Sequence, residues 1–322
     1  MFFNFFKKEP SPFNEGFLSV GNGHEIHYME FGNPNGQVII RFHGGPGGST
    51  HVGHALSFDL KTYRVILFDQ RGCGQSKFTD LLSHNTTIDT LSDTEKLLQH
   101  LKIPMKELIV SGSSFGATLA LLFAEKNPKS VQTLLLSSVF LARKQDLTWT
   151  NNDSRLFYPD LMYEMKKALQ SEENLLDGYN RLLFSGNYEQ MKTALKYYGS
   201  YEFCLGKTDV CFKDISGLTD KRINAMKIFL TYEQENIFLT DNQILKNIAT
   251  IKHIPTLIVH NRLDMTCPII QAWDLSQALD NATLIINPNI GHSSSDLKKC
   301  FQKQVDLFLK SKNNLLQQLK KQ

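Results

Sequence analysis

The fold of this chain is decided by Gly112-Ser113-Ser114-Phe115-Gly116, a match to the pattern Gly-x-Ser-x-Gly. The preceding run, 107–111, is apolar and typical of a buried strand, and 116–126 has a helical pattern. A tight turn from strand to helix holds a serine in a strained conformation with its hydroxyl exposed, and glycines on both sides let the turn close. We therefore predict that Ser114 is a nucleophile at a helix N-terminus, where developing negative charge is favoured.

Short apolar runs alternate with helical patterns on both sides of this turn. Helical patterns at 90–101 and 116–126 separate the early runs, which is typical of βαβ units. The alternation predicts a mostly parallel sheet flanked by helices. Turn signals at 21–23 and 33–36 predict a β-hairpin before it. The predicted sheet strands are 37–42, 64–68, 107–111, 132–136, 255–260 and 282–286.

The middle of the chain has a different character. Between residues 141 and 249 the Val/Ile-rich runs vanish, and charged, aromatic and Leu-rich helical patterns replace them. The strand pattern then returns. We therefore predict a core in two parts, residues 1–140 and 250–322, with an inserted helical cap over 141–249.

A second glycine-rich loop follows the predicted strand that ends at Phe42. It reads His43-Gly44-Gly45-Pro46-Gly47-Gly48. Glycines let main-chain N–H groups approach a carbonyl oxygen without a Cβ in the way, and a His-Gly-Gly run after an early strand is one known oxyanion loop. We predict an oxyanion hole formed by the N–H groups of Phe115 and Gly45, with Gly44 beside them.

Two later residues complete a catalytic set. Asp264 follows the predicted strand ending at His260, at the sheet edge where open α/β sheets place their sites. A carboxylate there can accept the Nδ1–H of a histidine and fix its tautomer. His292 is the only histidine downstream of both Ser114 and Asp264. Nucleophile, acid and histidine in that order are typical of the α/β-hydrolase fold, which is the fold we predict.

Beyond these motifs, the chain resembles the proline iminopeptidases (prolyl aminopeptidases), α/β-hydrolases that remove N-terminal residues, especially proline, from peptides. The resemblance covers the core nearly end to end and is weak only in the cap. It implies the same triad of Ser114, Asp264 and His292. The similar segments are 16–18, 32–36, 43–48, Asp69-Gln70-Arg71-Gly72-Cys73-Gly74-Gln75-Ser76, 85–87, the elbow with 118–121, 253–255, 267–268 and 272–273.

The resemblance also implies that cap glutamates hold the free α-ammonium group of the substrate. Glu202 corresponds to one family glutamate, and Glu233 fits the spacing of the second, with Glu235 as the alternative. A desolvated ammonium requires a paired charge, which gives this role a physical reason. The chain departs from the family at several positions. Phe115 follows the nucleophile where the family usually carries tryptophan, and Tyr198 and Tyr201 replace tryptophans in the cap. The segment 150–153 replaces an aromatic-glutamine stretch of the family. These changes bear on which N-terminal residue is preferred.

Three functions compete on this evidence. The first is an aminopeptidase acting through an acyl-enzyme on short peptides or aminoacyl amides with a free N-terminus. The second is a small-molecule esterase or amidase, whose activity would not depend on a free amine. The third is a binding module without catalysis, which the intact triad disfavours. Enzymes of this fold with Asp at the elbow are excluded by Ser114.

Composition limits the partners, the location and the cofactors that we expect. The net charge of +3 gives no electrostatic footprint for nucleic acid. No apolar run is long enough to span a membrane, and the apolar start 1–6 is too short for a signal peptide, so we expect a cytoplasmic enzyme. The 5 cysteines are scattered without a Cys-x-x-Cys pair, and no metal or organic cofactor is expected. The oligomeric state and the physiological substrate stay open.

Overall fold

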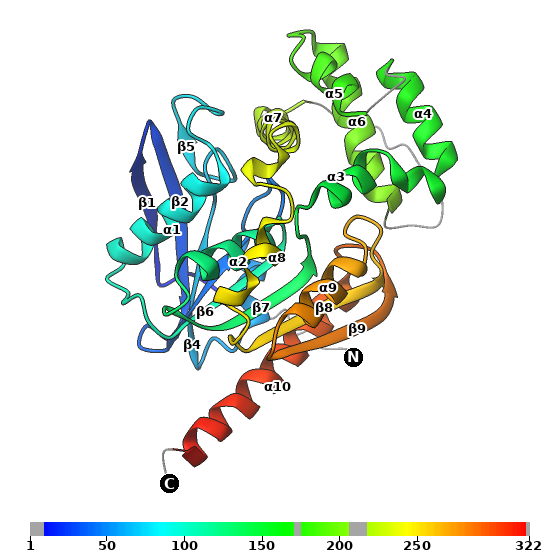
Figure 1. Ribbon diagram of the computed structural model, residues 1–322. Coiled ribbons are helices and arrows are strands. Elements are labelled where there is room, and N and C mark those ends of the chain that lie inside the picture. The colour runs from blue at the N-terminus through cyan, green and yellow to red at the C-terminus, as the bar shows by residue number, and fades with distance from the viewer. Residues whose placement is uncertain (1–9, 171–174, 206–217, 320–322) are drawn as a thin grey trace, which may run out of the picture.

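The computed structural model describes residues 10–170, 175–205 and 218–319; the apolar start 1–6 lies outside this part. Its strands are β1 Asn14–Gly21, β2 His24–Gly32, β3 Gln37–Phe42, β4 Tyr63–Phe68, β5 Lys77–Phe78, β6 Leu108–Ser114, β7 Val131–Val139, β8 Thr256–Leu263 and β9 Ala282–Ile290. They form one sheet in the order β1-β2-β4-β3-β6-β7-β8-β9, with β5 beside β2 (Figure 1). From β4 to β9 all pairs are parallel, and the pairs that involve β2 are antiparallel.

The predicted parallel sheet and the hairpin are confirmed, but the strands β6, β7, β8 and β9 extend further along the chain than predicted. The strands β8 and β9 continue into polar sequence, to Leu263 and Ile290. Side-chain amides make this possible, since Asn287 Nδ2 donates to Asn261 Oδ1 at 2.8 Å. Asp264 consequently follows its strand directly.

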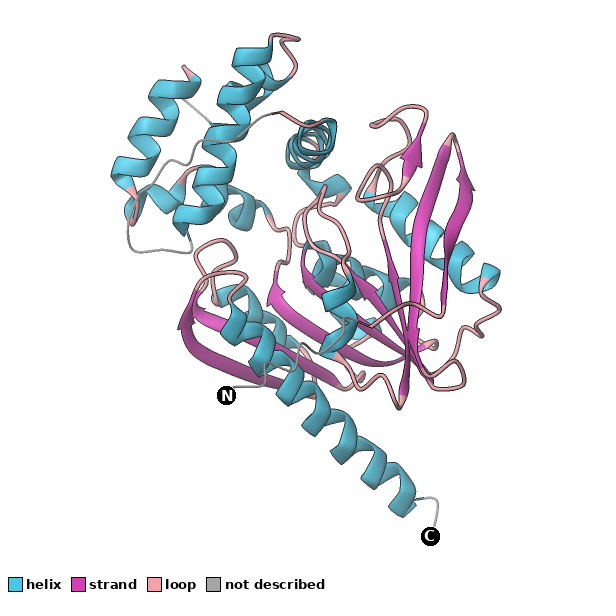
Figure 2. Cartoon of the chain, turned by 180° about the vertical axis from the view of Figure 1, so that it is seen from behind, coloured by secondary structure: helices cyan, strands magenta, loops and turns pink. Residues whose placement is uncertain are grey.

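Helices cover both faces of the sheet. One face carries α1 (Thr87–His100), α2 (Phe115–Lys126), α8 (Gln243–Asn247) and α9 (Ile270–Ala278). On the other lie the short 3-10 helix η1 (Val52–Ser57) and the long helix α10 (Ser295–Leu319), which Figure 2 shows in front of the sheet. Successive side chains of a strand point to opposite faces of the sheet. Because both faces are buried here, neighbouring residues such as Ile39 and Ile40 are both apolar.

A group of helices lies between β7 and β8 in the chain. We call it the inserted helices: α3 (Lys144–Asn151), α4 (Pro159–Leu169), α5 (Leu175–Leu183), α6 (Tyr188–Leu205) and α7 (Asp220–Gln234). Apolar side chains of α4, α5, α6 and one side of α7 form a core separate from those of the sheet. Leu147 of α3 and Ile228 and Tyr232 of α7 belong to the core of the sheet instead. Figure 1 shows α4, α5 and α6 together at one end of the molecule, apart from the strands. The domain boundaries at 140/141 and 249/250 stay a prediction.

None of the described helices is long and apolar enough to cross a membrane.

Candidate active site

Ser114 lies at the junction of β6 and α2 in a strained backbone conformation. Its φ of 58° and ψ of −130° are rare for a residue with a side chain. The two glycines of the pattern are sterically required. A Cβ on Gly112 would lie 2.0 Å from the carbonyl oxygen of Gly116, and one on Gly116 would lie 2.4 Å from that of Phe42. The turn therefore closes only with glycine on both sides, as the sequence pattern predicts.

Asp264 and His292 form a hydrogen-bonded pair beside this turn. Nδ1 of His292 lies 2.8 Å and 3.0 Å from the two carboxylate oxygens of Asp264. Backbone N–H groups of Thr266 and Cys267 donate to the same carboxylate. Burial alone would raise the pKa of Asp264, but the charge and hydrogen bond of His292 outweigh it and lower that pKa. Asp264 is thus held as an anion at neutral pH.

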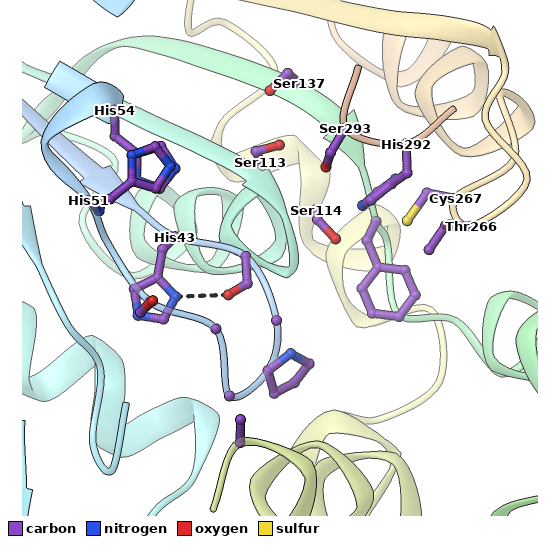
Figure 3. A pocket seen from close by; sticks show the side chains of 18 of the residues that line it. His43, His51, His54, Ser113, Ser114, Ser137, Thr266, Cys267, His292 and Ser293 are labelled. Atoms are coloured by element: carbon purple, nitrogen blue, oxygen red, sulfur yellow. Dashed lines mark hydrogen bonds between the residues drawn. The ribbon is translucent and has the colours of Figure 1, made fainter. Parts of the chain in front are cut away.

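The imidazole of His292 points toward Ser114 (Figure 3). With Nδ1 turned to Asp264, the ring presents Nε2 on its opposite side, toward the serine hydroxyl. Side-chain exposure falls from 19% for His292 to zero for Asp264. The acid is therefore shielded from solvent while the histidine is accessible from the cavity.

The glycine loop 43–48 lies against the nucleophile. A Cβ on Gly44 would be 3.2 Å from the Cβ of Ser114, so backbone and serine are in close approach. Two hydrogen bonds from Gln70 fix the loop: its N–H donates to His43 Nε2 at 3.1 Å, and its side-chain amide donates to the His43 carbonyl at 2.9 Å. This anchoring gives a physical role to part of the Asp-Gln-Arg-Gly run in the sequence.

The side chain of Phe115 is fully buried against Tyr232, with ring centroids 5.5 Å apart. The predicted role of Phe115 needs only its backbone N–H, which this packing leaves in place at the first position of α2. Gly44 and Gly45 line the cavity described next.

One cavity of about 860 Å³ connects Ser114 with the inserted helices. Its lining includes Ser114, His292 and Glu233 (on α7). Glu233 is 7% exposed, and Nδ2 of Asn151 donates to its Oε2 at 3.0 Å. Burial raises the pKa of Glu233 to about 7. A carboxylate in this state gains strongly from a cation that enters the cavity.

The other two predicted glutamates are placed differently. Glu235 is exposed just past the end of α7 and does not line the cavity. The turn at the end of α7 carries it to the surface, so Glu233 and not the alternative reaches the cavity. Glu202 belongs to α6, but its side chain lies outside the described residues.

Sequence reasoning missed Asn151, the partner of Glu233. Asn151 lies in the segment that departs from the family pattern, and it is far from Glu233 in the chain. No local pattern signals such a pair. It depends on how α3 and α7 pack.

Replacing Glu233 with Gln is expected to stabilise the protein at pH 8 and to have little effect at pH 5. Because the folded-state pKa is about 7 against an ordinary value of 4.5, stability is complete below pH 4.5 and falls as the pH rises toward 7. The loss amounts to about 3 kcal/mol. Melting temperatures of the wild type and Glu233→Gln at both pH values measure it.

Glu235→Gln is the matched control for this stability effect, since Glu235 is exposed on the same segment. It should leave the pH dependence of melting unchanged. If Glu233→Gln behaved like Glu235→Gln, the carboxyl of Glu233 would have an ordinary pKa.

Comparisons with known proteins agree with this geometry. A family profile described as the alpha/beta hydrolase fold matches residues 37–299. A proline iminopeptidase of Arabidopsis thaliana is 34% identical over 88% of this chain and 76% of its own length. A proline iminopeptidase of Xylella fastidiosa (strain Temecula1) is 33% identical over 89% of this chain and 93% of its own.

Among solved structures, a proline iminopeptidase-related protein from Thermus thermophilus is similar in fold. It matches with a TM-score of 0.57 at 21% identity, covering 90% of this chain and 96% of that one. At this identity the likeness supports the fold alone.

Proposed function

Because this chain belongs to the proline iminopeptidase family of the α/β-hydrolases, we propose that it is a serine aminopeptidase that releases N-terminal proline or another small apolar residue from peptides. One observation carries the proposal: the cavity that holds Ser114 also holds the buried carboxyl group of Glu233. Burying a carboxyl group costs free energy, and an esterase substrate without a charge would not offset that cost. A substrate with a free α-ammonium group would offset it by pairing with the carboxylate.

In the proposed reaction, Ser114 Oγ attacks the carbonyl carbon of the first residue, and His292 Nε2 takes the hydroxyl proton. The tetrahedral oxyanion accepts hydrogen bonds from the N–H groups of Phe115 and Gly45, with Gly44 beside them. His292 then returns the proton to the leaving amine as the C–N bond breaks. A water molecule hydrolyses the acyl-enzyme by the same route in reverse. Asp264 stabilises the imidazolium that forms in both halves.

The binding step pairs the substrate ammonium with Glu233. In the empty cavity the pKa of that carboxyl is about 7, so a substantial share of the molecules carries it protonated at neutral pH. An incoming ammonium stabilises the carboxylate and lowers that pKa. A blocked N-terminus brings no charge and gains nothing from Glu233. Glu202 is proposed as a second partner on the strength of the family resemblance alone.

Glu233→Gln is expected to damage hydrolysis of amine-bearing substrates selectively. Removing one partner of a buried charge pair costs about 3–5 kcal/mol, or roughly 10²- to 10³-fold in kcat/KM if the pair persists in the transition state. Hydrolysis of p-nitrophenyl acetate, which has no ammonium group, should change little. The measurement is kcat/KM on prolyl p-nitroanilide and on p-nitrophenyl acetate.

The control is Glu235→Gln, which removes the same charge outside the cavity and should match wild type on both substrates. Equal losses on both substrates in Glu233→Gln would mean that Glu233 supports the structure of the inserted helices. No loss on either would favour a small-molecule esterase.

The substrates proposed are short peptides or aminoacyl amides with a free N-terminus, and the location proposed is the cytoplasm. The location is supported by Cys73, Cys267 and Cys300, which are free thiols in the structure.

A further inference from the structure

Arg41 is a buried cation that lacks a counter-charge within the described part of the chain. It is 8% exposed and lies next to the end of β3, on the face covered by η1 and α10. Its Nη1 donates to Ser111 Oγ at 2.9 Å, and the guanidinium lies 5.6 Å from the ring centroid of Phe301. Its buried Nε has no hydrogen-bond partner among the described residues. No carboxylate of the described chain forms an ion pair with it.

An unpaired buried guanidinium is costly, because arginine does not relieve the cost by losing its proton. Burial lowers the pKa of Arg41 to about 10, which leaves it charged at neutral pH. A hydrophobic residue of similar volume would avoid the cost of burying this charge. The charge is thus a candidate for binding an anion, and its free donors are suited to an oxyanion such as a carboxylate.

Arg41 lines the same cavity as Ser114 and Glu233. Around Arg41 the lining carries Lys298 and Lys299 of α10, which are exposed at the rim. His54 of η1 also lines this part of the cavity. Burial, followed by the charge of Arg41, lowers the pKa of His54 to about 2, so its ring is neutral. Glu233 is the one carboxylate in the described lining, and it belongs to α7. Arg222 lies on that helix too, but Arg41, Lys298 and Lys299 come from the opposite, sheet side of the cavity.

The distance between Ser114 and Arg41 matches the length of a short peptide. Arg41 pairs in the sheet with Ser111, which precedes Ser114 on β6 by three positions, or about 10 Å of strand. An extended dipeptide spans about 7 Å. The long side chain of Arg41 can cover the remainder. A carboxylate two or so residues beyond the scissile bond is therefore within range.

We propose that Arg41, assisted by Lys298, binds the C-terminal carboxylate of a short peptide whose N-terminal residue is being removed at Ser114. The cavity then binds both ends of its substrate, the ammonium group at Glu233 and the carboxylate at Arg41. The enzyme accordingly favours di- and tripeptides over longer or C-terminally blocked chains. This inference rests on the proposed aminopeptidase function.

The test compares matched substrates that differ only at the C-terminus. Prolyl-glycyl-glycine is assayed as the free acid and as its C-terminal amide, with proline release as the readout. We expect wild type to prefer the acid by about 10- to 100-fold in kcat/KM, the range for hydrogen bonds to charged groups. Arg41→Met, which keeps the apolar stem volume without the charge, should bring that ratio close to one.

Lys303→Met is the matched charge control, because Lys303 is exposed on α10 outside the cavity lining. It should keep the wild-type ratio. Lys298→Met tests the same site through an exposed residue, where folding is not at risk. It should reduce the ratio about two- to five-fold. The melting temperatures of Arg41→Met and Lys298→Met check that both variants are folded.

The outcomes separate the two proposals. Efficient cleavage of acid and amide at equal rates would overturn the Arg41 site and leave the aminopeptidase standing. Failure to release proline from either would remove the aminopeptidase, and the carboxylate proposal with it. If inorganic phosphate raised the melting temperature through Arg41 while the acid/amide ratio stayed at one, the site would bind a free oxyanion, which contradicts a peptide carboxylate.

Discussion

Replacing Ser114 with alanine is expected to lower kcat by about 10⁶-fold, the scale seen when a serine hydrolase loses its nucleophile. The elbow offers no substitute, because the strained turn presents one hydroxyl to His292. Without Oγ no acyl-enzyme forms, and only binding and the oxyanion donors can still contribute. Steady-state kinetics on prolyl p-nitroanilide measure the loss. Covalent labelling by a fluorophosphonate should vanish in parallel.

Ser113→Ala is the control, since Ser113 is the neighbouring serine in the same turn and should leave the label in place. Label retained by Ser114→Ala, or lost from Ser113→Ala alone, would assign the nucleophile to Ser113.

The second large effect is expected for Asp264→Asn, with a loss of about 10⁴-fold in kcat and an intact fold. The carboxylate of Asp264 is buried and accepts Nδ1–H of His292, so it selects the tautomer whose Nε2 can take a proton. An amide can donate to Nδ1 and select the other tautomer. Kinetics measure the loss, and circular dichroism confirms the fold.

Two other aspartates serve as controls for Asp264→Asn. Asp241 accepts from the backbone N–H of Lys144, and Asp274 accepts from Arg143, so neither contacts His292. Their Asn variants should retain the wild-type rate. A near-wild-type rate for Asp264→Asn, with a large loss in one of these two, would move the role to that residue.

The parts of the fold that the sequence predicts correctly depend on local causes. The elbow follows from sterics within five residues, because Gly112 and Gly116 would each clash if they carried a Cβ. Strands buried on both faces are recognisable as continuous apolar runs. The sequence does not predict the polar ends of β8 and β9 as strand, because Asn261 and Asn287 have low β propensity and pair only across the sheet.

The site shows the same division. The chain order of Ser114, Asp264 and His292 is typical of the fold. The structure places Ser114 and His292 in the lining of one cavity, with Asp264 buried and hydrogen-bonded to His292. The sequence alone does not indicate that Arg41 binds a ligand, because a single charged residue near the end of an apolar run is common in strands. Only the packing of α10 over β3 shows that Arg41 is buried without a carboxylate partner among the described residues. Contacts between distant segments are not encoded in local patterns.

The central claim is that the enzyme requires a free amine on the residue it removes. The most direct measurement is the rate of the purified protein on prolyl p-nitroanilide and on N-acetyl-prolyl p-nitroanilide. A charge-paired ammonium predicts a preference for the free amine of at least about 10²-fold in kcat/KM. That preference should disappear in Glu233→Gln. Equal hydrolysis of both substrates by the wild type would contradict the account and leave a serine hydrolase that does not read the N-terminus.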